Sequence, residues 1–342
     1  MQYLPTDPVR LSDKGDSIII IDQRLLPNDL VTREIKSSED MYEAIKTLAV
    51  RGAPCIGVFA GYCVYVRSLY TSDDKLDDEL VGFCDYLNSS RPTAVNLSWA
   101  LGQMKDVLSQ SKGQPADKRR ELLKGKAQQI HQSDIDTCQK IAEYGLTLIK
   151  EGDGVITHCN AGALATSRLG TGLGALLLAA QRGIKLRPYV DETRPLLQGA
   201  RLTAFELEQA GLEPTLICDN MAAFVMSKGL VNAVFIGADR IAANGDTANK
   251  IGSLSLAINA KHFGVPFYVF APTSTVDKSC KSGDNIEIEI RDGDEIKSLY
   301  FEKPTAPEGV KCLNPAFDVV DNSLITAIIT EEGIFTPPYN FG

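Results

Sequence analysis

The stretch from residue 152 to residue 174 limits the fold more than any other part of the chain. A short apolar run at 155–156 leads directly into a polar cluster at 158–160. A glycine turn and an apolar helix at 173–180 come next. This order of features predicts a buried parallel strand whose carboxyl end carries polar, chemically active side chains.

The same order of strand, polar residues and helix recurs downstream. Strands are expected at 155–157, 186–190, 215–218, 233–238 and 266–271. Helices are expected up to about 181, at 198–209, up to 228 and at 250–263, and the tail after Gly333 is expected to be a loop. Five strands separated by helices indicate a Rossmann-like, doubly wound parallel sheet.

The first 145 residues have a mainly helical pattern, with a strand predicted at 16–22. A helix is expected to begin at Ser37 or Ser38, where a serine can cap it, and an apolar helix is expected to open at Cys55. The remaining helices are expected at 94–101 and 122–149. The chain of 342 residues is therefore predicted to be an α/β protein. It divides into a mainly helical domain at 1–145 and a Rossmann-like catalytic domain at 146–342.

The composition excludes several classes of partner. A net charge of −9 argues against nucleic acid, since a phosphate-binding face shows as an excess of basic residues. No apolar run reaches the roughly 18 residues that a membrane span needs, so we expect no membrane partner. The first residues have no basic segment before an apolar core, so we expect no signal peptide and a cytoplasmic protein.

The eight cysteines include no C-x-x-C pair, and no cluster has zinc spacing. They are expected to be reduced and mostly buried, with Cys55, Cys63 and Cys218 in apolar runs and Cys159 as the exception. His131 stands among polar residues and is expected to be exposed. The glycines at 170–174 lack the G-x-G-x-x-G spacing and are predicted to serve close packing within a helix. No P-loop or metal-ligand spacing is present either, so no cofactor and no metal are expected.

Ionisable residues follow most of the predicted strands, and ligands of an open parallel sheet bind at those carboxyl ends. Asp219 and Asn220 are expected to cap the helix that follows them. Asp239 is followed by more loop, which favours a catalytic acid or base. Cys159 precedes a turn whose backbone N–H groups can lower the pKa of a thiol, so it is a candidate reactive residue.

Three cations precede predicted helices. Arg51 stands beside Gly52, Arg91 precedes the helix at 94–101, and Lys250 follows Asn249 at the expected start of another helix. Helix starts attract anions, and together these cations can bind one phosphate. The sequence thus predicts an enzyme that acts on a small phosphorylated sugar or polyol without a metal.

Several long motifs resemble the S-methyl-5-thioribose-1-phosphate isomerase family, and the resemblance extends from about residue 18 to 332. They are Arg-Gly-Ala-Pro-Cys-Ile-Gly (51–57), Arg-Pro-Thr-Ala-Val-Asn-Leu (91–97), Thr-His-Cys-Asn-Ala-Gly-Ala-Leu-Ala-Thr (157–166), Asp-Glu-Thr-Arg-Pro-Leu-Leu-Gln-Gly-Ala-Arg-Leu-Thr-Ala (191–204), Asp-Asn-Met-Ala-Ala (219–223) and Gly-Ala-Asp-Arg-Ile-Ala-Ala-Asn-Gly-Asp (237–246).

This resemblance implies a step of methionine salvage, in which 5-methylthioribose 1-phosphate, an aldose, becomes 5-methylthioribulose 1-phosphate, a ketose. It also implies a homodimer. By motif match, Cys159 and Asp239 take the catalytic roles. The substrate contacts implied by the same match are Arg51, Gly52, Ala53, Arg91, Gln198, Asn249 and Lys250.

Some positions depart from the family pattern, among them Cys55, Ser98 and the segment 167–169. They leave the 5-substituent of the sugar open, so an isomerase of 5-deoxyribose 1-phosphate or ribose 1,5-bisphosphate is an alternative. Arg168 would suit a second phosphate, although a surface position is the preferred interpretation. A regulatory subunit of a translation-initiation exchange factor is a further alternative, against which Cys159 and Asp239 argue.

The expected chemistry begins with protonation of the ring oxygen, because phosphate on the anomeric oxygen blocks spontaneous ring opening. Asp239 is the expected acid, with a pKa raised by apolar neighbours at 234–236. Cys159 either carries the second proton or stabilises charge during a hydride transfer from C2 to C1. The sequence leaves both routes open.

Overall fold

The computed structural model describes residues 3–341 apart from residues 5 and 93. Two compact units are present. The N-terminal unit contains the chain up to Asp136 together with Ala163–Gly170, and the C-terminal unit contains Thr137–Gly162 and the chain from Thr171 onward. The division at 145 and 146 stays a prediction.

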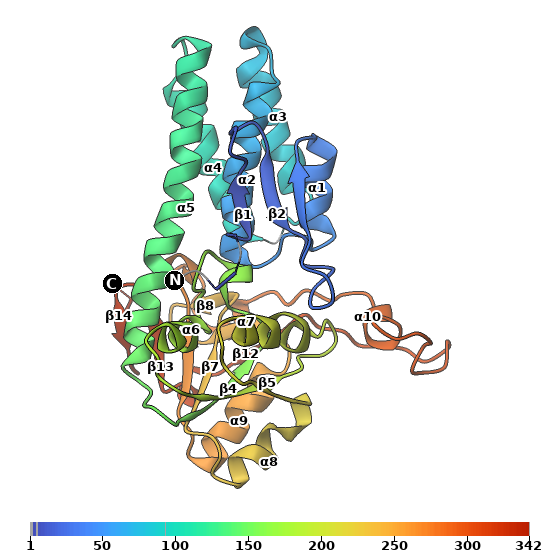
Figure 1. Cartoon of the computed structure of the whole chain (residues 1–342), viewed down its shortest axis with the longest axis vertical. Helices are drawn as coiled ribbons and strands as arrows, with labels where there is room; N and C mark the ends of the chain where they lie inside the picture. Colours follow the sequence, from blue (N-terminus) through green and yellow to red (C-terminus); the bar gives the residue numbers. More distant parts are fainter. Residues whose placement is uncertain (1–2, 5, 93, 342) are drawn as a thin grey trace. The chain divides into compact units, whose positions relative to one another are not determined.

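The N-terminal unit is mainly helical, as predicted, and also contains a small antiparallel sheet that was not predicted (Figure 1). Its elements are β1 (Val9–Leu11), β2 (Ile18–Ile21), β3 (Thr32–Ile35), α1 (Ser38–Lys46), α2 (Ala53–Leu69), α3 (Leu76–Asn88), α4 (Val95–Gln110) and the first part of α5 (Ala116–Leu146). Ser37 caps α1, as expected, since its hydroxyl accepts a hydrogen bond of 3.0 Å from the N–H of Asp40.

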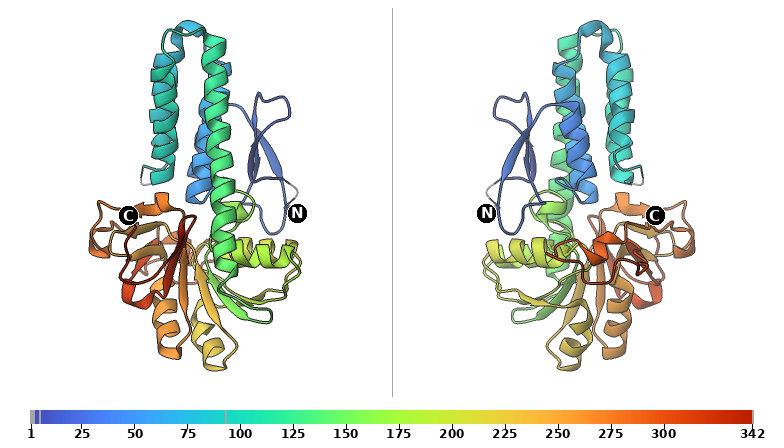
Figure 2. Two further views of the ribbon diagram at one scale, coloured as in Figure 1. Left: turned by 90° about the vertical axis from the view of Figure 1, so that its left-hand side faces the viewer. Right: turned by 90° about the vertical axis from the view of Figure 1, so that its right-hand side faces the viewer.

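Helix α2 forms the core of this unit, because apolar residues cover nearly its whole circumference. Buried residues extend from Cys55 to Val66 without interruption, and α1, α3 and α4 pack around them. Figures 1 and 2 show the long helices of the unit running side by side. The prediction that His131 is exposed is wrong. Its side chain lies on the inner face of α5, only 8% of the residue is exposed, and Nδ1 lies 2.9 Å from the hydroxyl of Tyr62.

The C-terminal unit is built on a seven-stranded sheet in the order β14-β13-β10-β7-β4-β5-β6. All neighbouring pairs are parallel except β13 and β14. The strands are β4 (Gly154–His158), β5 (Arg187–Asp191), β6 (Thr215–Ile217), β7 (Ala233–Ile236), β10 (Phe267–Phe270), β13 (Ala327–Thr330) and β14 (Gly333–Phe335). The chain proceeds outward from β4 in one direction and from β7 in the other, so the topological switch point lies between these two strands.

Helices cover both faces of the sheet, which confirms the doubly wound prediction. The helices are α6 (Gly174–Gln181), α7 (Ala204–Gln209), α8 (Ala222–Ser227) and α9 (Ser253–Phe263). Helices α8 and α9 lie side by side and share a core with Val269 of β10 (Figure 1). Phe270 points to the opposite face, because side chains alternate along a strand. There it approaches Gly145 of α5, which also faces Ala175 of α6.

A second, four-stranded sheet in the order β11-β8-β9-β12 was not predicted. Its strands are β11 (Val276–Asp277), β8 (Arg240–Ala242), β9 (Thr247–Lys250) and β12 (Phe317–Val320). The expectation that Lys250 opens a helix is therefore wrong. The backbone turns at Gly252, whose φ is +104°, and α9 begins at Ser253 with its N-terminal N–H groups bound by the carboxylate of Asp318.

Two further expectations about this unit need correction. The tail begins with the edge strand β14, which pairs antiparallel with β13, and the expected loop occupies only residues 336–341. The glycines at 170–173 precede α6 and do not lie within a helix. Their role in close packing is nevertheless visible at Gly172, where an added Cβ would lie 2.9 Å from the backbone after β7. No helix in the described residues is both long and apolar enough to cross a membrane.

Candidate active site

Cys159 and Asp239 follow the two strands that flank the switch point. Cys159 comes directly after β4, and Asp239 comes three residues after β7. The last residues of these strands, His158 and Ile236, are partners in the parallel register. The two predicted catalytic residues thus stand at the carboxyl ends of adjacent strands, where open α/β sheets bind ligands.

The thiol of Cys159 is half-buried and contacts another predicted residue directly. Its Sγ donates a hydrogen bond of 3.1 Å to Oε1 of Gln198, which is itself buried. The backbone of Cys159 has a φ of +62°, unusual for a residue with a side chain. Its N–H donates to the hydroxyl of Thr193 and its carbonyl accepts from the hydroxyl of Thr203.

A buried histidine–aspartate pair lies under Cys159. Nδ1 of His158 is 2.9 Å from Oδ2 of Asp191, and Nε2 is 2.9 Å from the carbonyl oxygen of Ile251. Nε2 therefore carries a proton, and a second proton is shared between Nδ1 and the carboxylate. Burial opposes the charge on His158, but the hydrogen bond and the charge of Asp191 outweigh it and raise the pKa of His158. Burial also raises the pKa of Asp191.

His158, Asp191 and Asp219 bring ligand atoms within 4.8 Å of one another, which is close enough for one metal ion. Hydrogen bonds already occupy both ring nitrogens of His158, Oδ2 of Asp191 and both oxygens of Asp219. Among the described residues, only Oδ1 of Asp191 in this set has no partner. Both oxygens of Asp219 accept backbone N–H groups, from Thr193 and from Arg194, each at 2.7 Å. The arrangement fits a hydrogen-bond network better than a metal centre, because a metal would displace these bonds. The expectation that Asp219 caps its own following helix is wrong, since its carboxylate binds this neighbouring loop.

Asp239 is exposed at the start of the connection to β8, and its N–H donates to the carbonyl of Ala248 at 2.9 Å. The apolar residues at 234–236 are fully buried inside β7. Residues 234–236 therefore do not surround the carboxyl group of Asp239 within the C-terminal unit. The apolar surroundings expected for this carboxyl group are absent there. The bond to Ala248 instead joins Asp239 to β9, which carries Asn249 and Lys250.

Asn249 and Lys250 are both buried, with 4% and 8% of each residue exposed. Nδ2 of Asn249 donates to the hydroxyl of Ser253 at 2.9 Å. The ammonium of Lys250 donates to the carbonyl of Ala316 at 3.2 Å and lies 4.5 Å from the centre of the Phe317 ring. The structure thus brings Asp239, Asn249 and Lys250 together on one antiparallel pair of strands.

The remaining predicted substrate contacts lie in the N-terminal unit. Arg51 is buried, Gly52 caps α2 with a φ of +89°, and Ala53 is the first residue of that helix, two residues earlier than expected. Any Cβ on Gly52 would lie 2.4 Å from the backbone of Ala165. Arg91 precedes α4. The starts of α2 and α4 are adjacent, since Gly57 approaches the carbonyl of Asn96. Arg51 and Arg91 therefore stand at the same end of this helix pair.

The structure also gives the positions of Arg168 and of the cysteines. The guanidinium of Arg168 is 53% exposed and lies 3.6 Å from the carboxylate of Asp7, so its surface position is confirmed. No disulfide joins any of the eight cysteines, which all lie within the described residues, and Cys55 and Cys63 are buried. Cys218 is exposed, which corrects the expectation that it is buried.

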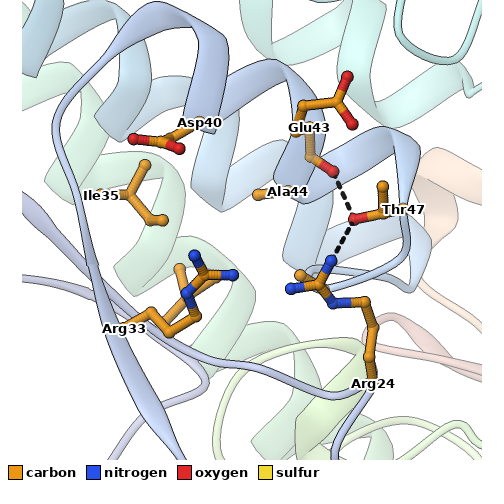
Figure 3. A pocket seen from close by; sticks show the side chains of 9 residues that line it. Arg24, Arg33, Ile35, Asp40, Glu43, Ala44 and Thr47 are labelled. Carbon is orange, nitrogen blue, oxygen red and sulfur yellow. Dashed lines mark hydrogen bonds between the residues drawn. The ribbon is translucent and has the colours of Figure 1, made fainter.

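A small cavity of about 80 Å³ lies elsewhere in the N-terminal unit, between the small sheet and α1 (Figure 3). Arg24 lies on its wall and binds both the hydroxyl of Thr47 and the buried carboxylate of Asp22. Burial alone would raise the pKa of Asp22, but hydrogen bonds from Arg24 and Arg33 keep that pKa below its usual value. None of the predicted site residues lines this cavity. Its charged groups connect the sheet to α1.

The model of the initiation factor 2 subunit family matches residues 49–337. A methylthioribose-1-phosphate isomerase of Symbiobacterium thermophilum is 51% identical, over 97% of this chain and 94% of that protein. The chain belongs to the methylthioribose-1-phosphate isomerase family, within the initiation factor 2 subunit family. The resemblance predicted from the motifs is confirmed.

Three further proteins similar to this chain have names that differ in the activity they state. A 5-deoxyribose 1-phosphate isomerase of Clostridium botulinum is 47% identical over 97% of this chain and 95% of its own. The crystal structure of 5-methylthioribose 1-phosphate isomerase from Pyrococcus horikoshii is 39% identical, with a TM-score of 0.92 over 99% of this chain and 97% of its own. The delta subunit of translation initiation factor eIF-2B from A. fulgidus is 38% identical, with a TM-score of 0.89 over 97% and 96%. The predicted fold class is confirmed.

Proposed function

We propose that this protein is an aldose–ketose isomerase that converts 5-methylthioribose 1-phosphate into 5-methylthioribulose 1-phosphate. The observation that carries the proposal is the position of Cys159 and Asp239 at the ends of the paired strands β4 and β7. The names of the 51% identical relative and of the solved structure support the same activity. The proposal includes a cytoplasmic homodimer that acts in methionine salvage.

In the proposed mechanism, the carboxyl group of Asp239 protonates the ring oxygen of the sugar as its bond to C1 breaks. The hydrogen on C2 then moves to C1, and the 2-hydroxyl releases its proton to solvent as the C2 carbonyl forms. Cys159 either relays the hydrogen as a proton or stabilises the charge beside a direct hydride transfer. Exposure of Asp239 in the C-terminal unit lets it exchange protons with solvent between turnovers.

The proposed phosphate contacts have the charge and the surroundings that binding of an anion requires. Lys250 is buried with a carbonyl and an aromatic ring as its neighbours, and in the described residues no carboxylate lies within 4 Å of its ammonium. A buried cation of this kind favours an anionic ligand, because the ligand restores the electrostatic stabilisation that burial removed. Within the N-terminal unit, the proposed substrate contacts are Arg51 with Gly52 and Ala53, and Arg91. Guanidinium groups and helix starts of this kind suit a phosphate.

A second candidate is isomerisation of 5-deoxyribose 1-phosphate, which the name of the 47% identical relative favours. A regulatory role without catalysis is the third alternative, since the eIF-2B delta subunit is nearly as similar in fold. The contact between Cys159 and Gln198 supports an enzyme, because a binding module has no need of a thiol aimed at a buried amide.

The test is an NMR assay of the purified protein with three substrates, 5-methylthioribose 1-phosphate, 5-deoxyribose 1-phosphate and ribose 1,5-bisphosphate. The methylthio sugar is expected to give the highest kcat/KM. Cys159→Ser and Asp239→Asn are each expected to fold and to lose at least ~10²-fold in rate. Turnover of none of the three sugars would overturn the proposal, and a preference for another sugar would establish the second candidate.

The same assay in deuterated water separates the two hydrogen-transfer routes. Deuterium at C1 of the product would support a proton relay through Cys159. Its absence would support direct hydride transfer from C2 to C1.

A further inference from the structure

The loop of residues 193–198, which follows β5, carries Gln198 to the thiol of Cys159. Three residues here have left-handed backbone conformations, namely Cys159 at φ +62°, Thr193 at +62° and Leu197 at +52°. Such a conformation is unfavourable for a side-chain-bearing residue, and especially for a β-branched one such as Thr193. Each persists only where surrounding contacts hold it.

The hydroxyl of Thr193 is one of these contacts. It accepts a hydrogen bond of 2.8 Å from the N–H of Cys159 and donates one of 3.0 Å to the carbonyl of Asp191. Thr193 is completely buried, so water has no access to replace either bond. The hydroxyl thus joins the end of β4 to the end of β5 next to the thiol.

The carboxylate of Asp219 holds the same loop from the other side. Its two oxygens accept the N–H groups of Thr193 and Arg194, both at 2.7 Å. Hydrogen bonds to an ionised acceptor are about twice as strong as neutral ones. Asp219 follows β6, so the ends of three neighbouring strands, β4, β5 and β6, are tied together through one loop.

We propose that Thr193 and Asp219 are positioning residues, which hold the strained backbone of Cys159 so that its thiol faces Gln198 and the substrate. Neither residue needs to touch the substrate. Loss of the Thr193 hydroxyl frees the N–H of Cys159 and lets its backbone relax out of the left-handed conformation. This inference rests on the proposed function only in taking Cys159 as the reacting thiol.

Two substitutions at one position give the sharpest test. Thr193→Val keeps the size and β-branching but removes the hydroxyl, whereas Thr193→Ser keeps the hydroxyl. The Val variant is expected to lower kcat about 10- to 100-fold, the cost of a misplacement on the order of 1 Å, while KM stays within about twofold. The Ser variant is expected to restore most of kcat. An equal loss in both variants would overturn the inference, because it would indicate packing alone.

A second readout needs no substrate. Alkylation of Cys159 by iodoacetamide, followed peptide by peptide across a pH series, reports the direction and environment of the thiol. The Val variant is expected to change the rate and its pH profile at Cys159 but not at Cys312, which lies in a separate irregular segment. An unchanged profile at Cys159 would overturn the inference. A changed profile in a protein that isomerises none of the sugars would refute the proposed function and leave the positioning role intact.

Asp219→Asn tests the second of the two proposed positioning residues. An asparagine presents one oxygen, so one of the two backbone N–H groups would face an amide N–H. The expected result is a fall in kcat and an altered alkylation profile in the same direction as for the Val variant. Asp321→Asn is the matched control, because Asp321 also binds a backbone N–H, that of Ser323, in another loop. Equal behaviour of the two Asn variants would overturn the assignment of Asp219.

Discussion

The ammonium of Lys250 lies 4.5 Å from the centre of the Phe317 ring, at a position where only 8% of the lysine is exposed. The ring face is electron-rich and attracts the cation without neutralising it. Lys250 therefore remains available to an anionic ligand. This relationship explains how a lysine can be buried in a strand of the small sheet.

Lys250→Gln should weaken substrate binding more than turnover. A hydrogen bond to a charged group contributes about 1.5–3 kcal/mol, so KM should rise about 10- to 100-fold. Steady-state kinetics with the preferred sugar phosphate provide the measurement. Lys261→Gln, which changes an exposed lysine on α9, is the control and should leave KM unchanged. A normal KM in the Lys250 variant would remove this residue from the phosphate site.

His131 should make the N-terminal unit less stable in mild acid. Burial lowers the pKa of His131 below its ordinary value of 6.5, although Asp7 opposes this and Arg168 adds to it. Below about pH 6.5 the unfolded chain binds a proton that the folded chain resists, so stability falls as the pH falls through this value. The measurement is urea unfolding at a series of pH values from 7.5 to about 5.5, by a probe of the helical unit.

The variant His131→Gln should show a smaller loss of stability over the same pH range. The variant His262→Gln, at an exposed position of α9, should behave like the unchanged protein. Identical pH dependence in all three proteins would contradict the assignment to His131.

Gly199→Ala should destabilise the protein and displace the neighbouring Gln198. An added Cβ would lie 1.7 Å from the carbonyl oxygen of Asp191, and forced overpacking of this kind costs about 1–3 kcal/mol or more. Gly102→Ala on α4 is the matched control, because no atom lies within 4 Å of its added Cβ. It should stabilise by about 0.5–1 kcal/mol through its better helix propensity. Thermal unfolding measures both, and a stable Gly199 variant would show that β5 can shift.

Phe301→Ala should loosen the irregular segment at 298–312. The guanidinium of Arg194 lies 5.1 Å from the centre of the Phe301 ring and also donates to the carbonyl of Ile296. Since a cation–π contact at a partly exposed site contributes about 0.5–1 kcal/mol, overall stability should hardly change. Limited proteolysis should instead cut this segment faster. Leu313→Ala, at a residue that is 78% exposed, should not accelerate cleavage. If the Phe301 variant and the unchanged protein are cleaved at equal rates, Phe301 does not hold this segment in place.

The middle strands of the central sheet, β4 and β7, were predictable because they are buried throughout and appear as short apolar runs followed by polar residues. The same pattern placed Cys159 and Asp239 at strand ends. The small sheet lacks this pattern. Strand β9 has the sequence Thr-Ala-Asn-Lys, and its burial comes from its partners β8 and β12 and not from its own composition.

Other errors have the same origin in long-range contacts. His131 has polar neighbours in the sequence, but its ring on α5 contacts the hydroxyl of Tyr62 on α2. Asp219 has the local sequence of a helix cap, yet its partners lie 25 and 26 residues earlier in the chain. The contact between Cys159 and Gln198 spans 39 residues, and only the family motifs, not local periodicity, indicated that both belong to the site.

Strands β4 and β7 are hydrogen-bonded neighbours although a long stretch of chain, including β5, β6 and their helices, separates them. Their ends are therefore fixed by backbone pairing and not by the length of the intervening chain. Insertions or exchanges in that stretch can reshape the walls around a sugar while the relation between the two strand ends is preserved. Relatives with this architecture can thus diverge in the sugar they accept and still keep one common chemistry.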